Sequence, residues 1–148
     1  RNSGYTDDTA LAERADVVTF TTAPLETELA VFGHPVVELD YATDNPHFDV
    51  FVRVSEVDES GRSSNVSDGF RRFDTAPDGP VRLELDPIAH RFAPGSRIRV
   101  LVAGGCHPRY ARNLGTGEAP ISGSRMMPST HTIRHGAATK LLLPVGRI

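Results

Sequence analysis

The feature that most limits how this chain can fold is a repeated alternation of apolar residues with a period of two. Ile98, Val100 and Val102 occupy every second position of one segment. The same pattern recurs in residues 37–42, 48–54 and 81–85. Side chains two apart point to one face of a strand, so each segment predicts a strand with one buried face. Since no helix-period segment of useful length occurs, we expect an all-β fold.

Turn signals separate these segments. Pro94 and Gly95 fit the centre of a type II turn, because proline presets φ and glycine tolerates a positive φ. Residues 58–61 are typical of a hairpin connection. Asp86 followed by Pro87 is a helix-start signal, so a short helical turn is expected over residues 88–90. Further strands are predicted at residues 17–20, 29–32, 62–66, 69–73, 130–134 and 141–143. Eight to ten short strands at this spacing predict a sandwich.

The chain has 148 residues, which fits one domain able to bury about two-thirds of its unfolded surface. Residues 1–14 are polar and are interpreted as a linker or N-terminal arm, which leaves residues 15–148 as the domain. The content of 13 Gly and 11 Pro suits a turn-rich β fold. No apolar run approaches the roughly 20 residues that cross a bilayer, so no membrane association is expected. The cellular location stays open.

Charge is distributed unevenly along the chain. Residues 1–74 carry 6 basic and 15 acidic side chains, whereas residues 75–148 carry 10 and 4. Because the two halves of a sandwich interleave, we interpret the asymmetry as internal pairing and expect no nucleic-acid partner. Cys106 is the only cysteine, which excludes an intrachain disulfide and a multi-cysteine metal site.

The sequence offers no complete catalytic or metal site. There is no G-x-S-x-G elbow and no alternating βαβ pattern to carry one, so no catalytic residues are predicted in this chain. His131 and His135 would lie about 13 Å apart on a strand, too far to share a metal ion. Asp44, His47 and Asp49 are interpreted as turn chemistry, because calcium needs six or more oxygen ligands. We expect no metal and no cofactor.

The loop from His107 to Asn113 is the candidate functional segment. Arg109 and Arg112 are three apart with Tyr110 between them, and their guanidinium groups could bind carboxylates or stack on rings. Arg109 and Asn113 could equally hydrogen-bond the carbonyls of the loop itself, and for Asn113 we favour that structural role. For His107 and Tyr110 both interpretations stay open.

Several segments in order resemble one known family. They are ERADVVTFTTAPL (13–25), HFDVFVRVSEVDESGRSSNVSDGFRR (47–72), AHRFAPGSRIRV (89–100) and HPRYARNLGTGE (107–118). Together they resemble the C-terminal domain of the X-prolyl dipeptidyl aminopeptidase and cocaine esterase group of serine hydrolases, which are acyl esterases. The similarity covers nearly the whole chain after about residue 13.

The resemblance implies a jelly-roll β-sandwich of the galactose-binding-domain-like type. It also implies that the serine, aspartate and histidine triad lies in an upstream domain. This chain would then be the non-catalytic C-terminal domain of a serine hydrolase with esterase or dipeptidyl-peptidase activity. It would pack on the α/β-hydrolase domain of the same parent and help to shape the substrate pocket. His107, Arg109, Tyr110, Arg112 and Asn113 are the pocket-lining or docking candidates.

Two other functions stay open. Jelly rolls also host carbohydrate-binding modules, but sugar platforms need exposed aromatic faces, and the chain has no Trp and three Tyr. A self-sufficient hydrolase that uses His107 with Cys106 or Ser124 is the third hypothesis. Cys106 is expected to be a small buried side chain rather than a nucleophile, because no base is placed beside it. Self-association as a homo-oligomer also stays open.

Overall fold

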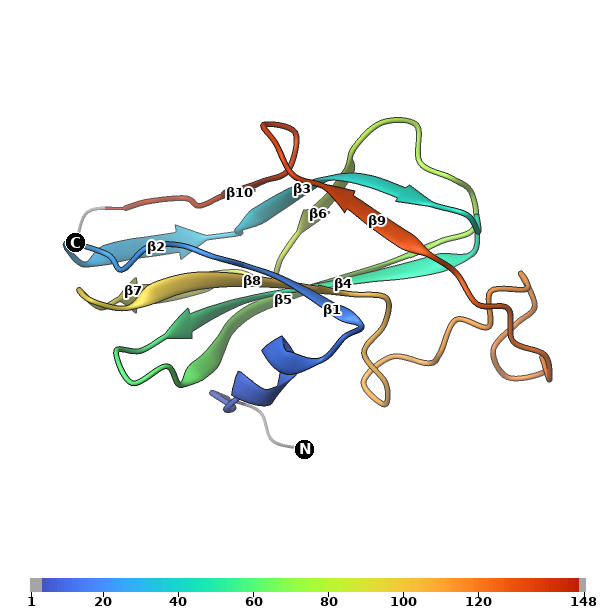
Figure 1. Cartoon of the computed structure of the whole chain (residues 1–148), viewed down its shortest axis with the longest axis horizontal. Helices are drawn as coiled ribbons and strands as arrows, with labels where there is room; N and C mark the ends of the chain where they lie inside the picture. The colour runs from blue at the N-terminus through green and yellow to red at the C-terminus, as the bar shows by residue number, and fades with distance from the viewer. Residues whose placement is uncertain (1–3, 147–148) are drawn as a thin grey trace.

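The computed structural model describes residues 4–146, which form a β-sandwich (Figure 1). A 3-10 helix, η1 (Thr9–Glu13), precedes the strands. The described residues contain β1 (Val17–Thr21), β2 (Leu29–Gly33), β3 (Val36–Thr43), β4 (Phe48–Val57), β5 (Ser63–Phe73), β6 (Val81–Glu84), β7 (Ile88–Phe92), β8 (Arg97–Ala103), β9 (His131–Arg134) and β10 (Lys140–Leu142). The predicted all-β sandwich of eight to ten strands is confirmed.

The strands form antiparallel sheets on two sides of one core. One sheet has the order β1-β8-β4-β5. Opposite it lie β10-β3-β6, with β9 also paired to β3, and the two-stranded sheet β2-β7. Residues 62–66 and 69–73 were expected to form two strands, but residues 63–73 form the single strand β5. The long partner β4 supplies a ladder along its whole length, with one register shift between Val54 and Ser55.

The core is built from every second residue of these strands. Val50, Val52 and Val54 of β4 are fully buried and belong to one cluster with Val37 and Leu39 of β3. Branched and aromatic side chains pack well on a pleated surface, and the cluster extends across both sides of the sandwich. The period-two pattern of the sequence therefore identified the core-facing residues correctly.

The expected helical turn after Pro87 is wrong. Residues 88–92 form β7, which pairs with β2 from Ile88 opposite Gly33 to Phe92 opposite Leu29. A pairing partner supplied by the distant β2 satisfies the backbone groups that a helical turn would have satisfied locally. Phe92 is thereby placed in the core.

The face of sheet β1-β8-β4-β5 that points away from the core is also covered. Phe51 and Leu101 lie outside the core cluster but are only 5% and 3% exposed. The N-terminal segment lies against this face: the Asp8 amide donates to the Ser63 carbonyl, and its carboxylate accepts from Ser55. This segment was expected to be a linker or arm. It forms η1 and contributes a buried aspartate, while the domain boundary at residue 15 stays a prediction.

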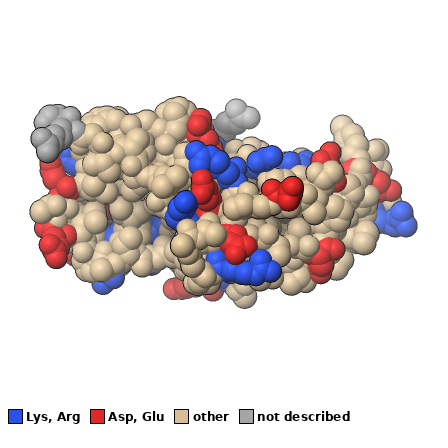
Figure 2. Space-filling view, turned by 90° about the horizontal axis from the view of Figure 1, so that it is seen from above, with Lys and Arg blue, Asp and Glu red and all other residues tan. Residues whose placement is uncertain are grey.

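The unequal halves of the chain pair with each other, as predicted. Within residues 4–146, five ion pairs join an acidic residue before residue 75 to a lysine or arginine after it: Arg82–Glu38, Lys140–Glu38, Arg91–Glu28, Arg134–Asp40 and Arg109–Asp68. On the face that Figure 2 shows, basic side chains lie beside acidic ones. Within residues 4–146 there is no helix long and apolar enough to span a membrane.

Candidate functional site

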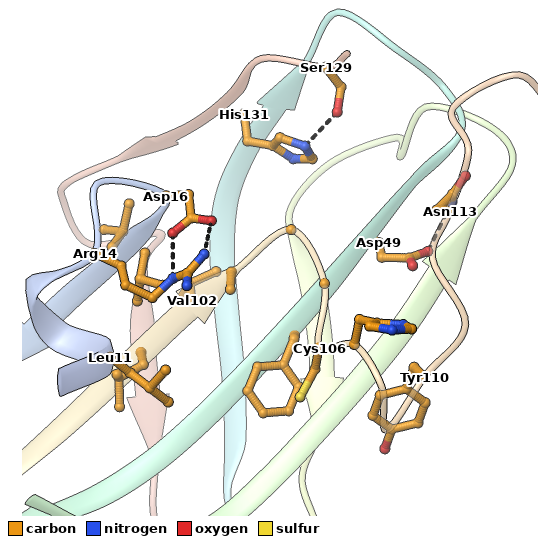
Figure 3. A pocket seen from close by; sticks show the side chains of 18 of the residues that line it. Leu11, Arg14, Asp16, Asp49, Val102, Cys106, Tyr110, Asn113, Ser129 and His131 are labelled. Atoms are coloured by element: carbon orange, nitrogen blue, oxygen red, sulfur yellow. Dashed lines mark hydrogen bonds and ion pairs between the residues drawn. The ribbon is translucent and has the colours of Figure 1, made fainter. Parts of the chain in front are cut away.

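A hollow of about 890 Å³ opens at one end of the sandwich. Its walls come from the end of η1 and the start of β1, from β4, from the loop after β8, and from the segment that enters β9. In Figure 3, Leu11, Arg14 and Asp16 lie on one side of this space, Asp49 and Asn113 lie on another, and Ser129 and His131 close it above. The hollow therefore gathers segments that are far apart in the sequence.

Asp49 anchors the loop that follows β8. This β4 carboxylate, with a side chain only 2% exposed, accepts two hydrogen bonds from Arg72 of β5 at 2.8 and 2.7 Å. It also accepts one from the Asn113 amide at 2.9 Å. The hydrogen bond to Asp49 raises the pKa of the Arg72 guanidinium. Two hydrogen bonds from a guanidinium and one from an amide hold the carboxylate in one position. Because Asn113 supplies the amide, the end of the loop is held on the sheet.

The middle of the loop is held by Tyr110 and Arg109. The Tyr110 ring stacks on the Phe70 ring of β5. Arg109 forms an ion pair with Asp68 of β5, which also accepts two hydrogen bonds from Arg53 of β4. Bonding to carbonyls of their own loop was the favoured interpretation for Asn113 and one of two open interpretations for Arg109. The two side chains bond carboxylates of β5 and β4 instead, since charged acceptors bind these donors more strongly.

Of the five predicted site residues, His107 and Arg112 are the ones that stay exposed to the hollow with no side-chain hydrogen bond or ion pair within residues 4–146. Tyr110 and Asn113 line the hollow as well, but Tyr110 also stacks on Phe70 and Asn113 also donates to Asp49. Arg109 is not among the lining residues. Four of the five predicted residues therefore line the hollow, whereas the side chain of Arg109 is bound to Asp68 of β5.

A line of three polar side chains at the hollow was missed by the sequence reasoning. The His131 imidazole lies between Tyr41 and Ser129: Nδ1 contacts the Tyr41 hydroxyl, and Nε2 lies 2.7 Å from Ser129 Oγ. Burial lowers the pKa of His131 and raises that of Tyr41, so both are neutral near pH 7. The Ser-x-His spacing was the available signal, since residues two apart on a strand share a face.

The tautomer of His131 decides whether Ser129 could be activated. In the tautomer that satisfies the buried Tyr41 hydroxyl within the described residues, the phenol donates its proton to His131 Nδ1. Nε2 then carries the hydrogen and donates it to Ser129 Oγ. A general base must accept the nucleophile's proton, and this arrangement does the reverse. The line is therefore a structural clasp between β3 and the entry to β9.

The residues of the self-sufficient hydrolase hypothesis are not assembled for catalysis. Burial raises the pKa of the Cys106 thiol, which keeps it protonated. Ser124 is exposed and has no imidazole partner within residues 4–146. His135 lies past the end of β9, and its ring packs against Phe20 in a tilted arrangement, with 5.0 Å between the ring centroids. No group of three or more His, Cys, Asp or Glu side chains able to hold a metal occurs in the described part of the chain.

The polar cluster before β4 is partly turn chemistry, as predicted. Asn45 Oδ1 accepts the His47 amide, which is a local Asx contact. Asp44, however, accepts the Thr130 amide, and the Asn45 side-chain amide donates to the Gly115 carbonyl. Asp49 is not a turn residue but the anchor described above. These contacts fix both ends of the segment from residue 114 to residue 130.

Comparison with known proteins places this geometry in a family. The model of the X-Pro dipeptidyl-peptidase C-terminal non-catalytic domain matches residues 3–143. A Mycobacterium bovis protein named as a serine esterase is 29% identical over 129 residues, which cover 68% of this chain and 20% of that protein. The chain therefore spans about a fifth of the length of the curated relatives it matches.

Several solved structures have a similar fold over nearly the whole length of this chain. An aminopeptidase from a Thaumarchaeota archaeon has a TM-score of 0.81 at 25% identity, and an α-amino acid ester hydrolase has 0.80 at 25%; each match covers 95% of this chain and 27% of the other. A CocE/NonD family hydrolase from Staphylococcus aureus, at 16% identity over 97% of this chain and 32% of its own, has 0.68 and shares the fold. This chain belongs to the family of X-Pro dipeptidyl-peptidase C-terminal non-catalytic domains.

Proposed function

We propose that this chain is the accessory domain of a serine hydrolase with esterase or dipeptidyl-peptidase activity, and that it packs on the α/β-hydrolase domain of the same parent. The wall of the hollow formed by residues 104–113 would complete the substrate pocket. In this proposal His107 and Arg112 face the pocket, while Arg109, Tyr110 and Asn113 hold the loop in place. The observation that carries the proposal is the family match to a non-catalytic domain, combined with a rigidly anchored loop beside an open hollow.

The segment from residue 114 to residue 130 supports docking at this end of the molecule. It projects from the sandwich before β9 (Figure 1), and Ser129 and Thr130 at its end line the hollow. Its side chains include Ile121, which is 98% exposed, and the exposed Met126 and Met127. Large apolar side chains gathered on one exposed segment mark an interaction surface. Interdomain interfaces of this kind bury on the order of 600–1,500 Å².

Carbohydrate binding has less support. Tyr41 is buried. Tyr110 is covered on one face by Phe70 and has the Arg109 guanidinium 5.4 Å from its ring, and the exposed Tyr5 contacts His90 of β7, so the three tyrosines do not form a shared platform for a sugar. The expected likeness of the sandwich to galactose-binding domains stays a prediction.

The test is association between this chain and the separately expressed hydrolase domain of its parent, measured by calorimetry, together with kcat/KM on p-nitrophenyl acetate. Ile121→Asp should weaken association at least tenfold, because a charge would be buried in an apolar contact. Val145→Asp is the matched control, since Val145 is also an exposed apolar residue but pairs with Val31 of β2. Strand β2 lies at the other end of the sandwich from the segment of residues 114–130 (Figure 1). No complex between the wild-type domains, or equal effects of the two variants, would contradict the proposal.

A further inference from the structure

We propose that Arg112 is a carboxylate-binding residue of the hollow. The proposal rests on the proposed function in one respect: when the hydrolase domain closes over the hollow, the charges on its walls lose contact with water. A guanidinium buried without an anion is strongly unfavourable. The charges that line the hollow therefore indicate what must enter it.

Both carboxylates of the hollow are already neutralised. Asp16 accepts two hydrogen bonds from Arg14, at 2.8 and 2.6 Å. Asp49 accepts two from Arg72 and one from Asn113. Each carboxylate thus has a guanidinium in the two-pronged geometry that suits it best, and neither needs a further cation.

The cations of the hollow are also paired, with one exception. Arg14 binds Asp16, and Arg53 binds Asp68 and lies 3.6 Å from Asp8. His131 is held as a neutral clasp, as described above. Within residues 4–146, Arg112 is the arginine of the lining that has neither an ion pair nor a hydrogen bond. The hollow therefore carries one unmatched positive charge.

The backbone around Arg112 is fixed although its side chain is free. The carbonyl of Ala111 accepts a hydrogen bond from Arg72, and the side chain of Asn113 bridges Asp49 and the Gly115 amide. An arginine held in this way loses little backbone entropy when it binds a ligand. His107, exposed on the same wall, adds a second hydrogen-bonding side chain.

A planar carboxylate is the ligand that matches this guanidinium. It could be a carboxylate of the parent's substrate or an Asp or Glu side chain of the hydrolase domain, and the chemistry at Arg112 is the same. The first test uses benzoate as the probe and benzamide as its uncharged analogue. Binding to this chain is followed by NMR of the backbone amides from Gly105 to Asn113 and of the Arg112 Nε–H.

We expect benzoate to shift these signals saturably, and benzamide not to. Arg112→Gln should weaken benzoate binding at least tenfold. Arg125→Gln is the control, since Arg125 is exposed, lies outside the lining and forms an ion pair with Glu118 at 3.8 Å. Absence of saturable benzoate binding, or an Arg112→Gln variant that binds benzoate as the wild type does, would overturn the proposal.

A second test in the full-length parent separates the two sources. If Arg112→Gln lowers kcat/KM at least tenfold for 4-carboxyphenyl acetate but not for phenyl acetate, the carboxylate belongs to the substrate. If it instead weakens association of the two separate domains, the carboxylate belongs to the hydrolase domain. If neither changes, the proposal is wrong. Failure of the wild-type domains to associate counts against the proposed function, whereas the benzoate titration of this chain does not depend on it.

Discussion

The ring of Tyr110 lies flat on the ring of Phe70, with 3.9 Å between the ring centroids and 5° between their planes. Phe70 belongs to β5, and Tyr110 belongs to the loop after β8. The guanidinium of Arg109 lies 5.4 Å from the Tyr110 ring, and that of Arg72 lies 5.9 Å from the Phe70 ring. This stack therefore fastens the loop to a sheet face that is otherwise only partly covered.

Replacing Tyr110 with Ala should lower the free energy of unfolding by about 1–2 kcal/mol, because the aromatic pair and its buried area are lost. Tyr110→Phe should cost less than about 0.5 kcal/mol, since the hydroxyl makes no hydrogen bond within residues 4–146. Urea unfolding of both variants is the measurement. Equal losses in the two variants would show that the hydroxyl, not the stack, holds the loop.

Two aspartates at the hollow should differ strongly in importance. Asp49→Asn should cost about 3 kcal/mol, because a buried carboxylate with three donors is replaced and Arg72 loses its partner. Asp16→Asn, in the exposed pair with Arg14, should cost less than about 1 kcal/mol. Chemical denaturation of both variants checks this difference. Similar costs would mean that Asp49 is solvated in solution.

Gly115 should tolerate a side chain less well than Gly61. Both have a positive φ, at 73° and 89°, so an alanine is strained by about 1–2 kcal/mol at either position. A Cβ at Gly115 would also lie 2.5 Å from the Met127 carbonyl oxygen, whereas a Cβ at Gly61 meets nothing within 4 Å. Gly115→Ala should therefore cost about 1–3 kcal/mol more than Gly61→Ala in thermal or urea unfolding. If the two variants are equally stable, Met127 does not pack against Gly115 in solution.

His131 should make stability fall as the solution becomes acidic. Burial lowers its pKa below the ordinary value of 6.5, against the opposing effects of Asp44 and Asp49. Between the folded and unfolded pKa values the unfolded state binds more protons, so stability is lost as the pH falls below 6.5. Below the folded pKa the loss is complete and does not grow further.

The measurement is the difference in unfolding free energy between the wild type and His131→Gln from pH 7.5 to pH 5. Taking this difference cancels the pH dependence contributed by the carboxylates that both proteins contain. An NMR titration of His131 should give a midpoint below 6.5. A midpoint above that value would mean that the fold favours the charged imidazole, and a difference that does not change with pH would mean that folding leaves the pKa of His131 unaltered. Either result would contradict the prediction.

Local patterns in the sequence predicted most of the strands. Alternation placed Val50, Val52 and Val54 in the core, because side chains two apart share a face whatever the strand pairs with. Gly95 has the positive φ of 80° that its turn with Pro94 requires. The strand of residues 88–92 was missed because its partner β2 is more than fifty residues away, and local propensity cannot report such a partner.

The candidate site was only partly foreseeable. The sequence identified the loop from His107 to Asn113 as too rich in specific side chains to be a plain connector. It could not show that Arg109 would be bound to Asp68 and Asn113 to Asp49, since those carboxylates come from β5 and β4. The clasp of Ser129, His131 and Tyr41 was missed for the same reason.

By itself, the sequence determined the all-β class, the core-facing positions and the family, because each depends on short-range periodicity or on motifs read in order. Only the tertiary structure decided which charged side chains of the hollow form ion pairs and which one has no partner within residues 4–146. Pairing between charges depends on distances of a few ångströms between segments that sheet registration brings together. The unmatched Arg112 and the neutralised Asp49 line the same hollow because of that registration, and no local pattern contains this arrangement.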